Sequence, residues 1–192
     1  DLVIYPSNLR SYKKKRVLSG FEYSIIRNDF NDAKYTLKRK VKNIILSFGY
    51  VDNKGVVIDT LKYLIDMNLK KKYNFSIIIG SKFKQKRKLK KLISKSGLSI
   101  DLIEDCTNIV DILQNTDLVI GSGGVSLLER SRLGVPSITF QVSENQKNQV
   151  NFFTKQQATM KFILKKNNFK KFSEIFSNIT TDYNLRRNLS KN

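Results

Sequence analysis

Short apolar runs alternate with amphipathic stretches along the chain from about residue 43 onward. Five runs are rich in Ile, Val, Leu and Phe: residues 43–49, 75–80, 98–103, 117–121 and 136–140. Apolar runs of this length with many β-branched residues are typical of buried strands. We therefore predict five strands, and a sixth short strand near residues 161–164.

The stretches between these runs have the spacing of helices. Val57, Leu61, Leu64 and Ile65 recur at i, i+4, i+7 and i+8, which places them on one helix face. Further helices are predicted up to about residue 95, around residues 109–113, over residues 125–133 and 144–157, and in the C-terminal part. Strands that alternate with helices predict an α/β fold: a Rossmann-like parallel sheet with helices on both faces.

The N-terminal part follows this alternation less well. Residues 1–5 are expected to form a strand and residues 22–27 a short extended segment, with a cationic segment between them. The chain starts at Asp1 rather than at Met, which suggests a fragment. We interpret residues 1–35 as the remnant of a preceding domain with its connector, and residues 36–192 as a ligand-binding domain.

The chain is strongly basic, with 36 Lys and Arg against 16 Asp and Glu, a formal net charge of +20 in 192 residues. Lys supplies most of these cations, whereas phosphate-reading sites favour the bidentate guanidinium of Arg. In the densest run, residues 82–91 and just beyond, Leu89, Leu92 and Ile93 have helical spacing. These features favour a solvated helix face over a nucleic-acid surface, and they leave peripheral contact with an anionic membrane open.

Two residue types limit the chemistry of this chain. It contains no His and one Cys, Cys106, so it lacks imidazole acid–base chemistry, a Cys-based zinc site and an internal disulfide. We predict no metal, no cofactor and a reducing, cytoplasmic location. No apolar stretch approaches the ~20 residues of a membrane span.

Glycine and polar residues follow several of the predicted strands, where ligands of open parallel sheets bind. Ser122, Gly123 and Gly124 join a strand to a helix, and the backbone N–H groups around Gly124 and Val125 are predicted to be free to bind a diphosphate. A tight turn would require the same glycines. Asp52, beyond the first strand, either lines the same cleft or only turns the chain.

Glu129 lies about one and a half helical turns beyond the last glycine of this loop. A carboxylate there could accept two hydrogen bonds from a vicinal diol such as a ribose. It could equally form a surface ion pair with Arg130, Arg132 or another cation. Spacing alone leaves both interpretations open.

Two other helix starts carry polar side chains. Ser143 and Gln146 have the spacing of a capping box, which would occupy both side chains with backbone N–H groups. Asn145, between them, remains available to face a ligand. Asn108 is a candidate N-cap of an earlier helix, and backbone groups near Ile109 could pair with a base.

Several motifs occur in an order that resembles the C-terminal, nucleotide-sugar-binding half of GT-B proteins. They are residues 107–113, residues 117–124, Leu128-Glu129-Arg130, Leu133-Gly134-Val135-Pro136 and Glu144-Asn145-Gln146. The likeness is nearest to the hydrolases of UDP-2,4-diacetamido-2,4,6-trideoxy-β-L-altropyranose in pseudaminic acid synthesis, grouped with spore-coat polysaccharide proteins. Residues 22–30 also resemble the interdomain connector of that family. The glycine loop is shared with the lipid-linked N-acetylglucosaminyltransferases of peptidoglycan synthesis.

The resemblance implies a UDP-sugar ligand. Ser122, Gly123 and Gly124, with the adjoining Val125, would hold the diphosphate, and Glu129 would hold the ribose hydroxyls. In such hydrolases water displaces UDP at the anomeric carbon. Their principal catalytic His belongs to a Gly-x-Gly-His motif of the N-terminal GT-B domain, which this chain lacks, so that domain is an expected partner and the catalytic residues stay unassigned.

The resemblance also implies contacts at the two ends of the ligand. Asn108 and Ile109 would meet the uracil, and Asn145 and Gln146 would face the phosphates or the sugar. One departure bears on the site, because Tyr50 stands where a second Gly of the loop after the first strand is usual. Close contact between this loop and a ligand is therefore an open question.

Three functions remain open from the sequence. The first is the UDP-sugar-binding domain of a hydrolase in nonulosonic acid or surface polysaccharide synthesis. The second is a GT-B glycosyltransferase domain with a lipid or sugar acceptor. The third is a non-catalytic basic module that binds nucleic acid.

Overall fold

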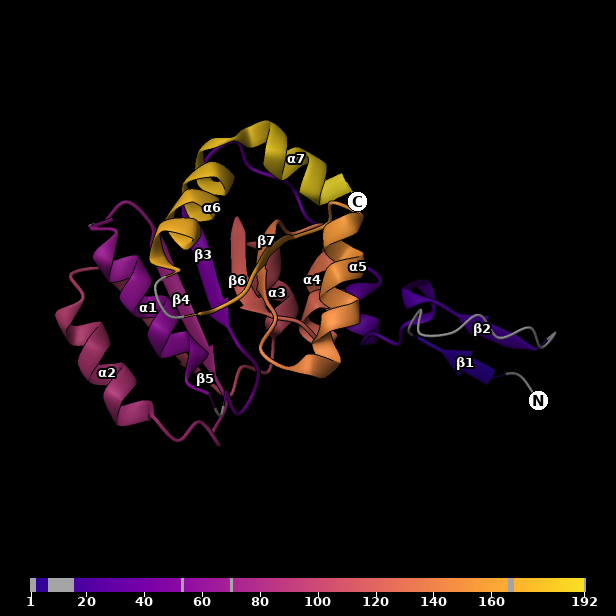
Figure 1. Ribbon diagram of the computed structural model, residues 1–192, viewed down its shortest axis with the longest axis horizontal. Helices are drawn as coiled ribbons and strands as arrows, with labels where there is room; N and C mark the ends of the chain where they lie inside the picture. The colour runs from indigo at the N-terminus through magenta and orange to yellow at the C-terminus, as the bar shows by residue number, and fades with distance from the viewer. Residues whose placement is uncertain (1–2, 7–15, 53, 70, 166–167, 192) are drawn as a thin grey trace.

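A six-stranded parallel sheet forms the body of the protein (Figure 1). The computed structural model describes residues 3–6, 16–52, 54–69, 71–165 and 168–191. In spatial order the strands are β5 (Ser99–Glu104), β4 (Asn74–Ile79), β3 (Asn43–Ser47), β6 (Leu118–Ser122), β7 (Ser137–Phe140) and β8 (Met160–Phe162). The predicted α/β class and the parallel sheet are confirmed.

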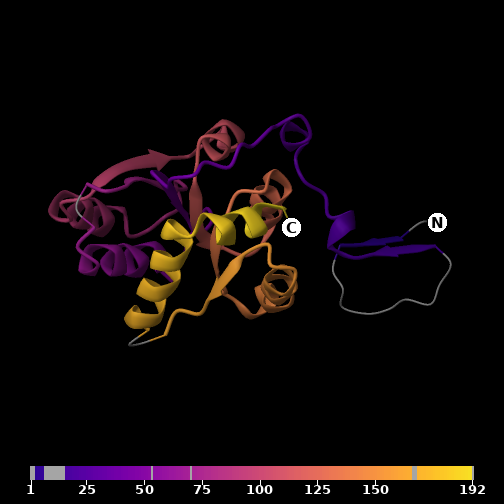
Figure 2. The same cartoon turned by 90° about the horizontal axis from the view of Figure 1, so that it is seen from above.

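Helices connect the strands and cover both faces of the sheet (Figures 1 and 2). They are α1 (Val56–Asp66), α2 (Lys86–Lys95), α3 (Ile109–Gln114), α4 (Val125–Leu133), α5 (Lys147–Lys155), α6 (Phe169–Thr181) and α7 (Tyr183–Lys191). A short 3-10 turn, η3 (Glu144–Gln146), precedes α5. No helix among the described residues is long and apolar enough to cross a membrane.

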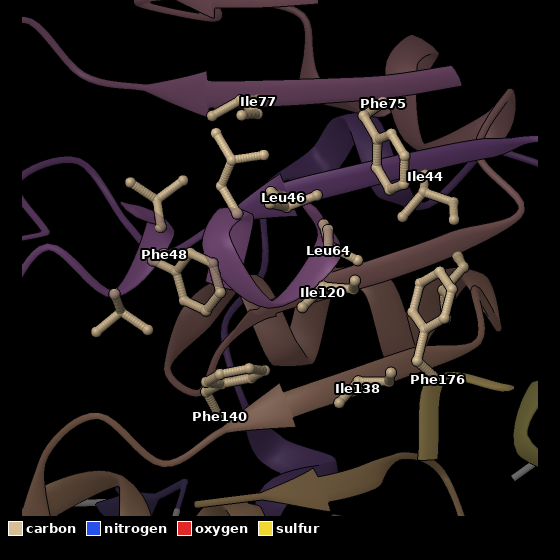
Figure 3. Packing of buried hydrophobic residues seen from close by; sticks show 14 of the residues in the cluster. Ile44, Leu46, Phe48, Leu64, Phe75, Ile77, Ile120, Ile138, Phe140 and Phe176 are labelled. Atoms are coloured by element: carbon tan, nitrogen blue, oxygen red, sulfur yellow. The ribbon is translucent and has the colours of Figure 1, made fainter. Parts of the chain in front are cut away.

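The core lies on two sides of the central strand β3, because successive side chains of a strand point to opposite faces. Ile44 and Leu46 belong to the larger cluster, which α1 and α6 cover with side chains such as Leu64 and Phe176 (Figure 3). Ile45 points the other way and packs in a smaller cluster with residues of α3 and α4. Both faces of the sheet are therefore buried, as the apolar strand sequences predict.

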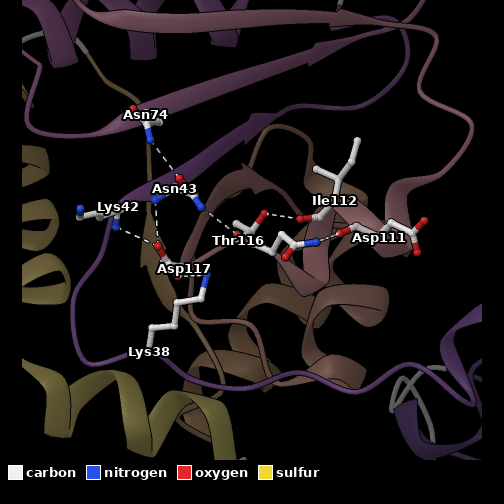
Figure 4. Close-up of polar contacts among 9 residues, drawn as sticks. Lys38, Lys42, Asn43, Asn74, Asp111, Ile112, Thr116 and Asp117 are labelled. Atoms are coloured by element: carbon white, nitrogen blue, oxygen red, sulfur yellow. Dashed lines mark hydrogen bonds and ion pairs between the residues drawn. The ribbon is translucent and has the colours of Figure 1, made fainter.

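The amino ends of the strands are held by one buried carboxylate (Figure 4). Asp117 accepts hydrogen bonds from the backbone N–H groups of Lys42 and Asn43, both at 2.8 Å, and Lys38 Nζ lies 3.4 Å from its other oxygen. Nearby, the buried guanidinium of Arg186 on α7 donates to backbone carbonyls that include that of Arg39. The amino ends of the strands thus hold the chain that enters the sheet, and the carboxyl ends remain available for a ligand.

The N-terminal part lies to one side of the main sheet (Figures 1 and 2). β1 (Val3–Tyr5) and β2 (Val17–Ser19) form a separate two-stranded parallel sheet. The strand expected at residues 1–5 is confirmed over residues 3–5 by β1, residues 1–2 lie outside the described residues, and β2 was not predicted. The extended segment expected at residues 22–27 is wrong at its start, because η1 (Phe21–Tyr23) is a 3-10 turn.

Residues 21–30 pack against helices of the main sheet at two places. Phe21 of η1 packs against Phe152 and Phe153 of α5, with ring centroids 4.9 and 5.7 Å apart. Phe30 of η2 (Asn28–Phe30) is fully buried beside residues of α3 and α4. The chain between residues 21 and 30 is therefore held against the same helices that begin near the carboxyl ends of the strands.

Candidate functional site

A cleft of about 510 Å³ opens at the carboxyl ends of β3, β4 and β5. Its lining includes Ser47, Tyr50, Ser81, Cys106, Ile109 and Ser126. The chain runs from β3 outward to β4 on one side and returns to β6 on the other, so this cleft lies at a topological switch point. Open parallel sheets bind ligands at such points.

Tyr50 forms one wall of the cleft. Its hydroxyl hydrogen-bonds the Ser81 hydroxyl, and its ring lies so close to Gly80 that a Cβ there would collide with it. The Ser81 N–H in turn donates to Asp105 Oδ1 at 2.6 Å. The turns after β3, β4 and β5 are thus linked to one another, and the half-exposed Tyr50 lines the cleft.

Asp52 holds the loop that carries this wall. Its two carboxylate oxygens accept the N–H groups of Val56 and Val57, each at 2.9 Å, in the first turn of α1. Burial raises the pKa of Asp52, against the effect of these hydrogen bonds. Of the two interpretations open from the sequence, the structure supports chain turning and helix capping.

The backbone N–H groups of the glycine loop are bonded within the protein to a greater extent than the sequence indicated. Gly123 N–H donates to Phe140 O at 3.2 Å, and Gly124 N–H donates to Gln149 Oε1 at 2.6 Å. The expectation of a free N–H at Gly124 is therefore wrong, because the amide of Gln149 bonds both its N–H and its carbonyl. Within the described residues, no protein acceptor meets the N–H groups of Val125 and Ser126, which begin α4.

The predicted capping box at the start of η3 is wrong. The Ser143 hydroxyl bonds Asn145 Oδ1 instead of a helix N–H. Gln146 Oε1 accepts from the N–H of Val142 at 3.2 Å, and its Nε2 donates to Gly123 O at 3.3 Å. Gln146 is thus brought to the glycine loop, whereas Asn145 is exposed on the outside of the turn.

Asn108 and Ile109 lie at the far side of the cleft. Asn108 Oδ1 accepts the N–H of Asp111 at 3.5 Å, which confirms Asn108 as the N-cap of α3. Its side chain therefore caps α3. Ile109 lines the cleft itself. The structure places this pair and the start of α4 on two sides of one cavity.

Glu129 is paired with a cation from the N-terminal part of the chain. Arg27 Nε lies 3.2 Å from Glu129 Oε1, and the Glu129 side chain is 12% exposed. Burial raises the pKa of Glu129, and the charge of Arg27 opposes that rise. Glu129 is one helical turn beyond Ser126 on α4, but it is not among the residues that line the cleft. Of the two interpretations, the structure shows an ion pair, with a partner 102 residues away.

Arg130 is buried, in contrast to the surface cation considered from the sequence. It is 1% exposed, and its Nη2 donates to Ser122 O at 2.9 Å and to Thr139 Oγ1 at 2.8 Å. Burial lowers the pKa of Arg130 to about 9. Helical spacing could have shown this, because Leu127, Arg130 and Leu133 fall on one face of α4 and all three are buried.

Cys106 lines the cleft, and burial raises the pKa of its thiol. A small, packed side chain is therefore the better description of it, as expected. Within the described residues, no three His, Cys, Asp or Glu side chains gather around a point where a metal ion could be held.

The fold and the cleft at its switch point define a glycosyltransferase-like GT-B domain. The chain belongs to the glycosyltransferase family 28 C-terminal domain family, whose sequence pattern matches residues 57–188. It is 26% identical to the spore coat polysaccharide biosynthesis protein SpsG of Bacillus subtilis over 147 residues, or 76% of this chain and 43% of that protein. It is also 26% identical to the uncharacterized protein MJ1062 of Methanocaldococcus jannaschii over 135 residues, or 67% of this chain and 28% of that protein.

A solved structure supports the same fold. MurG of Acinetobacter baumannii superposes with a TM-score of 0.72 and 15% identity, covering 99% of this chain and 54% of that one. The chain thus spans under half the length of the two curated relatives and about half the length of MurG. The predicted GT-B half-fold is confirmed by this match.

Proposed function

We propose that this chain is the UDP-sugar-binding domain of a hydrolase that releases UDP from a 2,4-diacetamido-2,4,6-trideoxyhexose in nonulosonic acid or surface polysaccharide synthesis. The observation that carries the proposal is the cleft at the switch point, with the unpaired N–H groups of Val125 and Ser126 at one side and Ile109 at the other. The similarity to SpsG supports a role in polysaccharide synthesis.

The diphosphate would bind at the start of α4. Free N–H groups and the positive end of a helix favour an anion there, and Ser126 lines the same cleft. Ser122 and Gly123 would give the loop its shape, since the Ser122 carbonyl and the Gly123 N–H are already bonded within the protein. Gly124 would donate to a phosphate only after Gln149 moves away.

The nucleoside would extend from this point across the cleft. Backbone groups at Asn108 and Ile109 would meet the uracil. The Glu129 carboxylate, already paired with Arg27, would also accept hydrogen bonds from the ribose hydroxyls. Gln146, bonded to Gly123 O, and the exposed Asn145 would lie on the sugar side. The proposal keeps all of these residues in the roles that the family resemblance implies.

We assign residues 1–35 to the end of an N-terminal GT-B domain and its connector, and residues 36–192 to the nucleotide-sugar-binding domain. The side chains of β1, namely Val3, Ile4 and Tyr5, are 42%, 47% and 39% exposed. Parallel strands are normally buried on both faces, and two strands alone are marginally stable. The exposed β1 therefore supports a larger sheet around β1 and β2.

Turnover would require that N-terminal domain, because this chain holds no His. A glycosyltransferase is the second candidate, favoured by the family 28 match. An assay of the full-length protein separates the two. Release of UDP and free sugar without an acceptor supports the hydrolase, and turnover that requires a lipid or sugar acceptor supports the transferase.

The binding proposal is tested by thermal unfolding with UDP. A ligand at about 100 times its Kd stabilises the folded state by about 2.7 kcal/mol, which raises the Tm of a domain this size by about 5–10 °C. Glu129→Ala should reduce the shift, whereas Glu144→Ala should leave it unchanged, because Glu144 is exposed and, among the described residues, its carboxylate pairs with Lys147 alone. An unchanged Tm at millimolar UDP would refute UDP binding.

A further inference from the structure

Arg130 carries a buried charge that no carboxylate neutralises by contact. Its side chain is 1% exposed, and within the described residues no Asp or Glu oxygen lies at ion-pair distance from it. Glu129 is its sequence neighbour, yet that carboxylate pairs with Arg27. Burying an unpaired cation is costly, by several kcal/mol.

The guanidinium lies directly beneath the glycine loop. Its Nη2 donates to Ser122 O, the carbonyl that precedes Gly123, and a Cβ built on Gly121 would lie 3.6 Å from Nη1. Its Nη2 also donates to the Thr139 hydroxyl, which in turn hydrogen-bonds the Thr159 hydroxyl. Arg130 Nε has no hydrogen-bond partner. The charge is therefore held between β6 and β7, close behind the start of α4.

Arg27, Glu129 and Arg130 set the charge beside the glycine loop, whereas Asp105 places a carboxylate at the β5 end of the same cleft. The Arg27–Glu129 pair is neutral as a unit, and Arg130 adds one positive charge behind the loop. Protein interiors screen a charge less than water does, so its field extends into the cleft. The N–H groups of Val125 and Ser126, which have no protein acceptor among the described residues, lie at this start of α4.

We propose that Arg130 is a positioning residue for the diphosphate, which holds the Ser122 carbonyl in place and supplies the buried positive charge that favours phosphate over hydroxyl at the start of α4. The inference rests on the proposed function, because it assigns a role within the same UDP site. It concerns the phosphates alone, so the nucleoside end of the ligand should not depend on it.

The test compares UDP, UMP and uridine binding by calorimetry across variants of Arg130. Arg130→Met and Arg130→Gln remove the charge, and each should lower the UDP-to-uridine affinity ratio on the order of tenfold. Arg130→Lys keeps the charge and should keep most of the ratio. Thr139→Val, the matched control, removes a hydrogen-bond partner of the guanidinium but no charge, and should lower Tm while leaving the ratio intact.

A purely structural role would weaken UDP and uridine equally, so an unchanged ratio in folded Met and Gln variants would overturn the inference. If those variants do not fold, the wild-type protein still decides: the NMR signal of the Arg130 Nε–H should shift with UDP and stay in place with uridine. An unmoved signal would overturn the inference. If UDP binds and the UDP-to-uridine affinity ratio is unchanged in the variants, only the role of Arg130 is refuted. If the wild-type protein does not bind UDP, the proposed function is refuted as well.

Discussion

Asp52 offers a direct test of how the cleft wall is held. It lies three residues before Gly55, the formal N-cap of α1, and yet its carboxylate accepts the N–H groups of Val56 and Val57, both at 2.9 Å. Asp52 also has a φ of 36°, a conformation in which Asn and Asp are enriched. Asp52→Ala removes both hydrogen bonds and places an unsuited residue in that conformation.

The expected cost follows from these contacts. Replacing a helix-capping Asp with Ala typically costs 0.5–2 kcal/mol, and two lost bonds of about 1 kcal/mol each point to the upper end. A loss of about 2 kcal/mol lowers the Tm of a domain of this size by about 4–8 °C. Asp52→Asn keeps one acceptor and tolerates the backbone, so it should lose about half as much.

Thermal and urea unfolding measure the loss, with Asp59→Ala as the control on the same helix. The Asp59 side chain is 45% exposed and, among the described residues, its carboxylate pairs with Lys62 alone, so its removal should cost less than about 0.5 kcal/mol. Equal stability of the Asp52→Ala and Asp59→Ala variants would refute the capping argument. UDP affinity should also fall in Asp52→Ala, because the loop that it holds carries Tyr50 into the cleft.

Two further predictions concern the same cleft. Gly80→Ala should lower stability by about 1–3 kcal/mol, because its Cβ collides with both the ring and the backbone carbonyl of Tyr50. Tyr50→Gly removes the ring and keeps the carbonyl, so a double variant should recover at most part of that loss, and a Gly80→Ala variant as stable as wild type would contradict the collision. The raised pKa of Glu129 means that the folded state holds this proton more tightly than the unfolded state. The bound proton therefore stabilises the folded state at pH values below the ordinary pKa of 4.5. This stabilisation is lost as the pH rises through the raised pKa of the folded state. Urea unfolding should therefore show wild type losing stability relative to Glu129→Gln as pH rises above 4.5, and a difference independent of pH would contradict the raised pKa.

The sheet and most helices could be predicted because their signals are local. The apolar runs match β3 to β8 to within a few residues, and α4 begins and ends at the predicted Val125 and Leu133. Spacing within a few residues decides which face of such an element is buried. The fold class and the order of the elements thus follow from patterns that a short window of sequence contains.

The sequence predicts where the site lies, at the carboxyl ends of the strands, but not which partners its polar side chains bond. Spacing gives no sign that Arg27 would meet Glu129 across 102 residues, or that Gln149 would bond Gly124 across 25. The capping box failed for the same reason, because Gln146 found a partner in the glycine loop. Polar side chains choose partners that folding brings near, and the local sequence carries little information about that choice.

The strand order has a consequence for how the chain assembles during synthesis. β3 is made first among the strands of the main sheet and ends up near its centre, with β4 and β5 on one flank and β6, β7 and β8 on the other. Each strand that leaves the ribosome can thus join an edge that already exists, and none has to be inserted between two paired neighbours. Growth outward from one early strand suits a chain that folds while it is still being made.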